Sequence, residues 1–323
     1  MPTPPPHPPS RSLPLSLSLP SHLTCRPLGQ DDARAVYEAM AAQELHDLGE
    51  TEIEEADIVG DWQRPSFDVA ASTVGVFDRE HGGLLVGYAE ITGADRGDAA
   101  VRPSHRGRGI GTWLAAWMRE TARARGARII GMPVPEGSAG DLLLASLGYH
   151  VRWTSWVLKL DRGAAVPDRP LPAGCTVGAA DPAEYGAVHD LVEDAFLEWS
   201  DRERESYDDF AAVTTLRPGF EPWHLRVVRG PDGVPLACAH VSVYDAEDGR
   251  GSEAYIARLA TRADQRGRGL AQALMVDTFA RAREHGAETS GLSTDSRTGA
   301  LGLYEKVGMR VTSTWLHRAV HLT

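Results

Sequence analysis

In residues 225–282 of this chain, short runs of apolar residues are followed by a segment in which apolar residues recur at helical spacing. The runs 225–228 and 234–243 flank Pro231-Asp232-Gly233, which predicts two strands joined by a hairpin turn. The residues 255–261 predict a further strand. The apolar positions of 270–282 then recur at helical spacing, which predicts an amphipathic helix.

The earlier part of the chain repeats this order of elements. Strands are predicted at 74–77 and 84–91, and a helix is predicted at 110–122. Each part ends in another apolar run, at 151–160 and at 311–322, which predicts a final strand. The pattern as a whole is typical of an α/β protein.

An internal repeat explains this similarity. The segment Arg106-Gly107-Arg108-Gly109-Ile110-Gly111 matches Arg266-Gly267-Arg268-Gly269-Leu270-Ala271, and 266 minus 106 gives an offset of 160 residues. The same offset places glycine at 126 and 286, and again at 148 and 308. A period this long indicates a duplicated domain.

The repeat and the composition divide the chain. Residues 1–22 are rich in Pro and Ser and are expected to be disordered. A first copy is predicted over 23–160 and a second over 173–323. The Pro-, Gly- and Ala-rich segment 161–172 is the predicted linker.

The formal net charge of -12 argues against nucleic acid as a partner, because phosphate binding needs a basic surface. The absence of a run of about 18 apolar residues argues against a membrane span. The three cysteines at 25, 175 and 238 form no pair typical of a disulfide framework or a zinc site. We therefore expect a cytoplasmic protein, a monomer or homodimer, that contains no metal.

The glycine-rich turn between a strand and a helix is the clearest chemical signal. Backbone N–H groups at such a turn, with the helix dipole, form an anion site, and glycine lets a phosphate approach closely. The Gly-Lys-Ser/Thr ending of a P-loop is missing, and the glycine spacing and late position differ from the dinucleotide fingerprint. The pyrophosphate arm of coenzyme A is the remaining interpretation.

Arg-x-x-Gly-x-Gly/Ala after a strand resembles motif A of the GNAT acetyltransferases, and 298–309 resembles their motif B. The resemblance implies two tandem GNAT-type modules, each a mixed, mostly antiparallel twisted sheet flanked by helices. It also implies acetyl-CoA as acyl-donor cosubstrate, with pantetheine bound to backbone where a bulged fourth strand splays from the fifth.

The resemblance assigns cofactor-binding residues in both copies. In the second copy they are Leu259, Ala260, Thr261, Arg266, Gly267, Arg268, Gly269, Leu270 and Ala271. In the first copy they are Ala99, Ala100, Val101, Arg106, Gly107, Arg108, Gly109, Ile110, Gly111 and Thr112.

The catalytic residues differ between the copies. Tyr304 matches the family's tyrosine acid, whose phenol is protonated at neutral pH and can donate a proton to the departing thiolate. The first copy has Leu144 at the matching position, which has no proton to donate. Glu253 is the first candidate for the general base, with Asp194, Glu221 and His240 as alternatives.

These features predict an N-acetyltransferase that moves an acetyl group to a primary amine of a small molecule by direct transfer in the C-terminal module. The tandem layout resembles the mycothiol synthases, in which the C-terminal module is the active one. Two alternatives are a non-catalytic acyl-CoA-binding or regulatory protein and an acetyltransferase acting on a protein amine.

Overall fold

The computed structural model describes residues 18–245 and 251–322, and most of the segment 1–22 with its predicted disorder lies outside them. The first copy contains β1 (Leu23–Arg26), α1 (Ala33–Asp47), α2 (Glu55–Trp62), α3 (Val69–Ser72), β2 (Thr73–Asp78), β3 (Leu84–Thr92), β4 (Arg96–Val101), α4 (Ile110–Ala124), β5 (Ile129–Pro135), α5 (Ala139–Ser146) and β6 (His150–Leu160). The second contains β7 (Thr176–Ala179), α6 (Tyr185–Phe196), α7 (Tyr207–Val213), β8 (Leu225–Arg229), β9 (Pro235–Asp245), β10 (Ser252–Thr261), α8 (Leu270–Glu284), β11 (Ala287–Asp295), α9 (Leu301–Glu305) and β12 (Arg310–His321).

The twelve described strands form one sheet in the order β1-β2-β3-β4-β5-β12-β6-β11-β10-β9-β8-β7. Most neighbouring strands are antiparallel, and the pairs β4–β5 and β10–β11 are parallel. The mixed, mostly antiparallel α/β architecture expected from the sequence is therefore confirmed. The sheet edges of the two copies are joined, so that one sheet runs through the whole chain.

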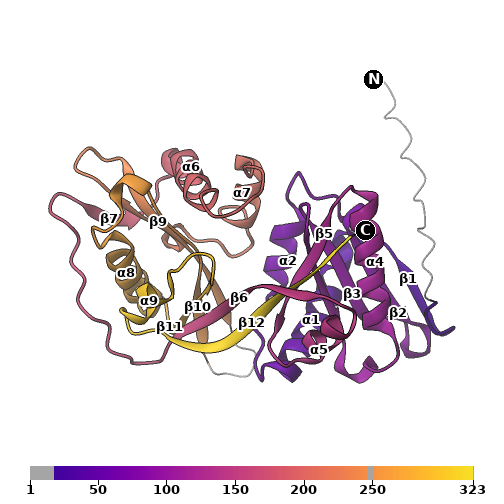
Figure 1. Ribbon diagram of the computed structural model, residues 1–323. Helices are drawn as coiled ribbons and strands as arrows, with labels where there is room; N and C mark the ends of the chain where they lie inside the picture. The colour runs from indigo at the N-terminus through magenta and orange to yellow at the C-terminus, as the bar shows by residue number, and fades with distance from the viewer. Residues whose placement is uncertain (1–17, 246–250, 323) are drawn as a thin grey trace.

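The last strand of each copy completes the sheet of the other copy. β12 lies between β5 and β6, and β6 pairs with β11 of the second copy. Figure 1 shows β6 and β12 side by side as they cross the middle of the molecule. The segment between β6 and β7, which contains the predicted linker 161–172, connects the copies along the chain, while the two terminal strands join their sheets.

Helices cover both faces of each half of the sheet. Leu85 packs with α1, whereas its neighbour Val86 packs with α4, because successive strand residues point to opposite faces. In the second copy, Val227 packs with α6 and Val228 packs with α8 for the same reason. Each copy therefore has two apolar clusters, one on each face of the sheet.

The exchanged strands also contribute to the core of the opposite copy. Leu158 and Leu160 of β6 are buried in the cluster around α8 of the second copy. Val320 and Leu322, at the end of the chain, pack against the cluster around α4 of the first copy. The strands predicted at 151–160 and 311–322 are confirmed, but the apolar pattern did not indicate with which copy each would pair.

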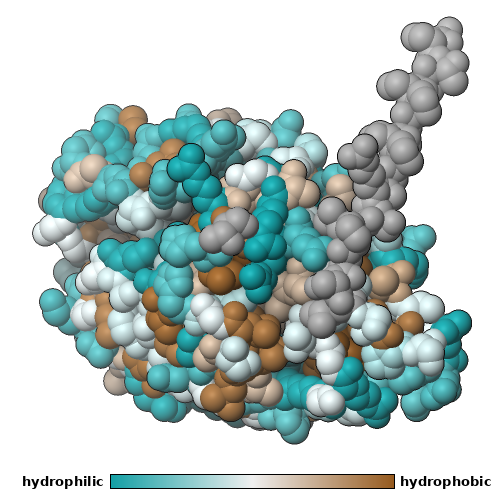
Figure 2. All heavy atoms as spheres, turned by 45° about the vertical axis from the view of Figure 1, so that its right-hand side comes forward, coloured by the Kyte–Doolittle hydropathy of each residue, from teal (hydrophilic) through white to brown (hydrophobic). Residues whose placement is uncertain are grey.

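Hydrophilic side chains cover most of the face shown in Figure 2, with smaller hydrophobic areas between them. Among the described helices, none has the length and apolar character needed to cross a membrane.

Candidate functional site

The glycine-rich turns have the same backbone geometry in both copies. Gly107 and Gly109 have φ of 76° and 83°, and Gly267 and Gly269 have φ of 75° and 82°. Gly109 caps α4 and Gly269 caps α8 in this left-handed conformation, which L-amino acids with a side chain rarely adopt. The backbone conformation of the turn therefore requires glycine at these positions. Glycine also leaves room for a phosphate to approach the backbone closely.

The strand before the second turn diverges from its parallel neighbour. β10 pairs with β11 from Ser252 to Ile256 and no further, although β10 continues to Thr261. A bulge at Ala257, between Ile256 and Arg258, shifts the register against β9. The end of β10 stays paired with β9 but not with β11, and it carries the backbone of Leu259 to Thr261 along the gap between β10 and β11.

A cavity of about 1110 Å³ opens at this divergence, here called the second-copy cavity. It is lined by the predicted cofactor residues Leu259, Ala260, Thr261, Arg266, Gly267, Gly269, Leu270 and Ala271, and Arg268 is outside the lining. The strand gap, the turn and the start of α8 thus share one space. Free N–H groups of the first helical turn face such a space at the positive end of the helix dipole.

Tyr304, the predicted acid, also lines the second-copy cavity. It lies on α9, close to Thr294 of β11. Burial raises the pKa of the Tyr304 phenol above its ordinary value, so that it carries its proton at neutral pH. Tyr255 of β10 is a second phenol in the lining, and burial raises its pKa to about 12.

Glu253, the predicted base, is outside the lining of the second-copy cavity. Its Oε2 lies 3.0 Å from Nζ of Lys159, a residue of β6. Nζ of Lys159 also lies 3.5 Å from Oε1 of Glu52, and Glu52 does line the cavity. Glu253 is therefore connected to the cavity through an ion-pair cluster that spans both copies.

The three alternative bases also lie outside that lining. The Asp194 side chain is 70% exposed and forms an ion pair with Arg204. The Glu221 side chain is 61% exposed and accepts a hydrogen bond from Trp223 Nε1. His240 is buried, and burial lowers its pKa well below the ordinary value.

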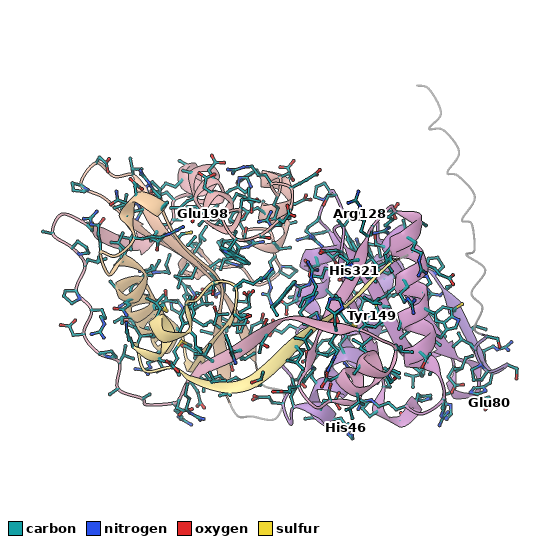
Figure 3. All side chains as sticks on the ribbon, viewed as in Figure 1. His46, Glu80, Arg128, Tyr149, Glu198 and His321 are labelled. Atoms are coloured by element: carbon teal, nitrogen blue, oxygen red, sulfur yellow. The ribbon has the colours of Figure 1, made fainter. Side chains whose placement is uncertain are left out.

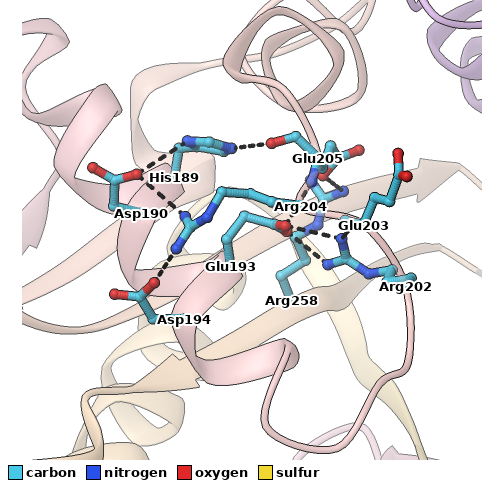
Figure 4. A network of polar contacts seen from close by, with 9 residues as sticks. All are labelled: His189, Asp190, Glu193, Asp194, Arg202, Glu203, Arg204, Glu205 and Arg258. Atoms are coloured by element: carbon cyan, nitrogen blue, oxygen red, sulfur yellow. Dashed lines mark hydrogen bonds and ion pairs between the residues drawn. The ribbon is translucent and has the colours of Figure 1, made fainter.

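A polar network holds the loop that follows α6 (Figure 4). The Glu193 side chain, which is 0% exposed, binds Arg202 with both oxygens at 2.7 and 2.8 Å and accepts a hydrogen bond from Glu205 N at 2.7 Å. His189 Nε2 lies 2.8 Å from the Glu205 carbonyl oxygen. These contacts hold the second half of the loop between α6 and α7 against α6.

The same loop carries Glu198, which Figure 3 labels in the second half of the molecule. Glu198 binds both terminal nitrogens of Arg266, at 2.6 and 2.8 Å. The two side chains are 45% and 43% exposed, so water screens the pair and an incoming anion can replace the carboxylate at low cost. The arginine of the second turn is therefore available to a phosphate.

The first copy has a smaller cavity of about 440 Å³ at the equivalent place, here called the first-copy cavity. It is lined by the predicted residues Ala99, Val101, Arg106, Gly107, Gly109, Ile110, Gly111 and Thr112, while Ala100 and Arg108 are outside the lining. Leu144 lines it where the second copy has Tyr304.

Polar groups of the first-copy cavity are already engaged by its own helix α1. Val101 N donates to Gln43 Oε1 at 2.9 Å, and Arg106 binds both oxygens of Asp47 at 2.7 Å. Within the described residues, Thr261 N of the second copy has no such side-chain partner. The first copy thus offers fewer free groups to coenzyme A than the second.

Three potential metal ligands, Asp78, His81 and His105, come together beside the turn of the first copy, with their ligand atoms within 4.8 Å of one another. Asp78 Oδ2 lies 2.9 Å from His81 Nδ1 and 3.2 Å from His105 Nε2. These hydrogen bonds account for the closeness of the three side chains: the Asp78 carboxylate contacts both histidines and so holds the segment before Arg106 in place.

The structure adds residues that the sequence analysis did not identify. Residues of the first copy and of the last strand line the second-copy cavity: Glu52, Arg96, Pro133, Trp153, Ser155, Val157, Trp315 and His317. They reach the cavity because β6 and β12 cross between the copies and bring the two halves of the sheet together. Strand pairing was the missing information, since no local motif marks these residues.

The comparisons with known proteins agree with this architecture. The model of the acetyltransferase (GNAT) family matches residues 31–145 and again 185–309. Mycothiol acetyltransferase from Frankia casuarinae is 32% identical over 170 residues, which are 49% of this chain and 46% of that protein. Mycothiol acetyltransferase from Nocardia farcinica is 30% identical over 71% of this chain and 77% of that protein.

The chain thus spans about half the length of the first of these relatives and about three quarters of the second. Among solved structures, a GCN5-related N-acetyltransferase from Sphaerobacter thermophilus superimposes with a TM-score of 0.71 at 24% identity, and the match covers 94% of this chain and 97% of that one.

Proposed function

We propose that this chain, which belongs to the acetyltransferase (GNAT) family, moves an acetyl group from acetyl-CoA to a primary amine of a small molecule. The second-copy cavity is the proposed site. The observation that carries the proposal is that one cavity brings together the bulged end of β10, the glycine turn before α8 and the phenol of Tyr304.

The residues of this cavity fit acetyl-CoA as the acyl-donor cosubstrate. The backbone of Leu259 to Thr261, which β11 leaves unpaired, would hydrogen-bond the pantetheine arm. The N–H groups of the turn and the Arg266 guanidinium would bind the pyrophosphate. Bound in this way, the cosubstrate would place its thioester in the gap between β10 and β11, close to α9.

In the proposed reaction the amine nitrogen bonds to the acetyl carbon while the bond from that carbon to sulfur breaks. The nitrogen loses one proton, and the leaving thiolate gains one. Tyr304 would donate the proton to sulfur, because its raised pKa keeps the phenol protonated at neutral pH. Glu253 would accept the proton from nitrogen, by way of Glu52 and solvent at the edge of the cavity.

A small-molecule acceptor is favoured over a protein amine by the size and shape of the site. The cavity of about 1110 Å³ lies between the two copies and is lined by both, as is typical of ligand pockets at domain interfaces. The two relatives described above are named for acetyl transfer in mycothiol chemistry, which agrees with a small-molecule acceptor.

Replacement of Tyr304 tests the proposal. We expect Tyr304→Phe to lower kcat by about a hundredfold to ten-thousandfold, the usual contribution of a general acid, with little change in the Kd for acetyl-CoA. The measurement is release of free CoA over a panel of primary amines, together with an acetyl-CoA titration. Unchanged turnover by Tyr304→Phe would remove Tyr304 from the chemistry.

Tyr149→Phe is the matched control. Tyr149 lies in the first copy (Figure 3) and is 4% exposed, and its hydroxyl has no hydrogen-bond partner among the described residues. We expect this variant to retain full activity. If the wild-type protein binds acetyl-CoA but acetylates no amine of the panel, the result would instead support the non-catalytic acyl-CoA-binding alternative.

A further inference from the structure

The far part of the second-copy cavity lies at the seam between the copies. Its wall is built from β4, β6 and β12, which contribute Arg96, Trp153 and His317 respectively. The His317 and Trp153 rings are stacked with their centroids 3.7 Å apart. This part of the cavity lies beyond the strand gap and the glycine turn, and it is therefore where an acceptor would enter.

Arg96 is the charged residue of this wall that keeps its guanidinium available. Its side chain is exposed in the cavity, and it has no ion pair or hydrogen bond with another side chain among the described residues. The other charged residues of the lining are ion-paired: Arg266 with Glu198, Arg297 with Asp295, and Glu52 with Lys159. Arg96 interacts electrostatically with the carboxyl groups of Asp61 and Asp98 but forms no short-range ion pair with either, so its guanidinium can still bind an anion in the far part of the cavity.

His317 presents a second unused polar group. It is 3% exposed, and its Nδ1 has no hydrogen-bond partner in the part of the chain that the structure describes. Burial, with the positive charges of Arg96 and Arg152, lowers the pKa of His317 to about 3, so that the ring is neutral at physiological pH. A buried nitrogen without a partner is costly, and a ligand that bonds to it would remove that cost.

We infer that Arg96 and His317 form a subsite for an anionic group of the acceptor, which is therefore a primary amine that also carries a carboxylate or a phosphate. This inference rests on the proposed function, because it describes the acceptor end of the same cavity. The anion would bind the Arg96 guanidinium. His317 Nδ1 is buried, so a small movement of its ring would bring the Nδ1 proton of the matching tautomer to the anion.

The subsite would discriminate between amines by charge. An acceptor that carries an anion gains a charged hydrogen bond, whereas an amine without one leaves Arg96 and His317 unpaired beside it. The cationic form of such an amine is also repelled by Arg96. Loss of a hydrogen bond to a charged group corresponds to about a tenfold to hundredfold change in affinity or kcat/KM.

Matched pairs of amines test the inference. The pairs are phenylalanine beside phenylethylamine, lysine beside cadaverine, and phosphoethanolamine beside ethanolamine, and the last pair separates a phosphate from a carboxylate. Binding is measured by calorimetry on the full chain saturated with CoA, so that the anion site of the glycine turn is filled. Acetylation of each amine is measured by release of CoA.

We expect tighter binding and higher kcat/KM for the anionic member of at least one pair. Arg96→Gln should remove this preference by lowering affinity for the anionic member about tenfold or more, and affinity for the member without an anion should not fall. Arg34→Gln is the control, because that side chain lies on α1 with 59% exposure, outside the cavity.

Equal affinity for both members of every pair would overturn the inference, as would an anionic preference that survives Arg96→Gln. The binding measurement decides this even if no amine is acetylated. Failure of the protein to bind acetyl-CoA would contradict the proposed function separately, and the two failures are therefore distinguishable.

Discussion

Two buried carboxyl groups distinguish the first-copy cavity from the second at the residue scale. Burial raises the pKa of both Glu44 and Asp98 to about 7, and both line this cavity. Within the described residues, neither forms an ion pair with a cationic side chain at short range. A negatively charged ligand such as coenzyme A would lie close to these two carboxyl groups. Its charge would disfavour their ionised forms further, which would weaken its binding to the first copy.

Asp98 provides a prediction about stability and pH. Its pKa of about 7 lies above the ordinary value of 3.8, so the folded state holds a proton that the unfolded state releases. The Asp98 carboxyl therefore contributes favourably to the free energy of unfolding below pH 4, and this contribution is lost as the pH rises through 7. We expect Asp98→Asn to stabilise the protein at pH 8 by about 1–3 kcal/mol relative to wild type, and much less at pH 5.

Urea unfolding at the two pH values measures this difference. Glu80→Gln is a suitable control, because Glu80 is an exposed residue on the turn between β2 and β3. A difference between Asp98→Asn and wild type that is equal at pH 5 and pH 8 would contradict the assignment of the raised pKa to Asp98.

Single residues also show how far the sequence could predict the site. Tyr304 and the glycine turn line the same cavity, and the sequence could associate them because two motifs of one copy mark them. Arg96 and His317 lie 221 positions apart (317 minus 96), and neither belongs to a local pattern. They meet because of strand pairing, which apolar periodicity does not specify.

At the scale of elements, the two glycine turns have the same backbone but different surroundings. Arg106 and Asp47 are 22% and 10% exposed, whereas Arg266 and Glu198 are about half exposed. A pyrophosphate that enters the first copy must break a mostly buried ion pair and displace Gln43 from Val101 N. At the second turn a pyrophosphate displaces only an exposed ion pair, which costs less free energy. We therefore expect the second turn to bind acetyl-CoA more tightly.

Charge reversal at the two turns tests this expectation. Arg266→Glu should weaken acetyl-CoA binding at least tenfold, because it replaces a phosphate-binding cation by a repelling anion. Arg106→Glu should leave the tighter binding event unchanged. Isothermal titration with acetyl-CoA gives both the affinity and the number of sites. Equal losses in the two variants would show that the copies bind with similar affinity.

At the scale of the whole molecule, the exchanged strands should make the two copies unfold together. Leu158 of β6 is fully buried in the core around α8, so Leu158→Ala should destabilise the protein by about 2–5 kcal/mol. Because β6 pairs with β11 and β12 pairs with β5, we expect a single transition that moves as a whole to lower temperature.

Differential scanning calorimetry checks this prediction. Val311→Ala on β12 is the control, since that side chain is 38% exposed and its loss should change stability by about 0.5 kcal/mol or less. Two separate transitions, of which Leu158→Ala moves only one, would show that the copies unfold independently despite the shared sheet.

The position of β12 also has a consequence for the order of events during synthesis. The ribosome delivers residues 310–321 after all the other described strands, yet they form the strand that covers the edge of β5 in the half of the protein made first. Until residues 310–321 have been made, that half has an open sheet edge, which can pair with other chains. The N-terminal half therefore begins to fold first but is completed only when β12 has formed.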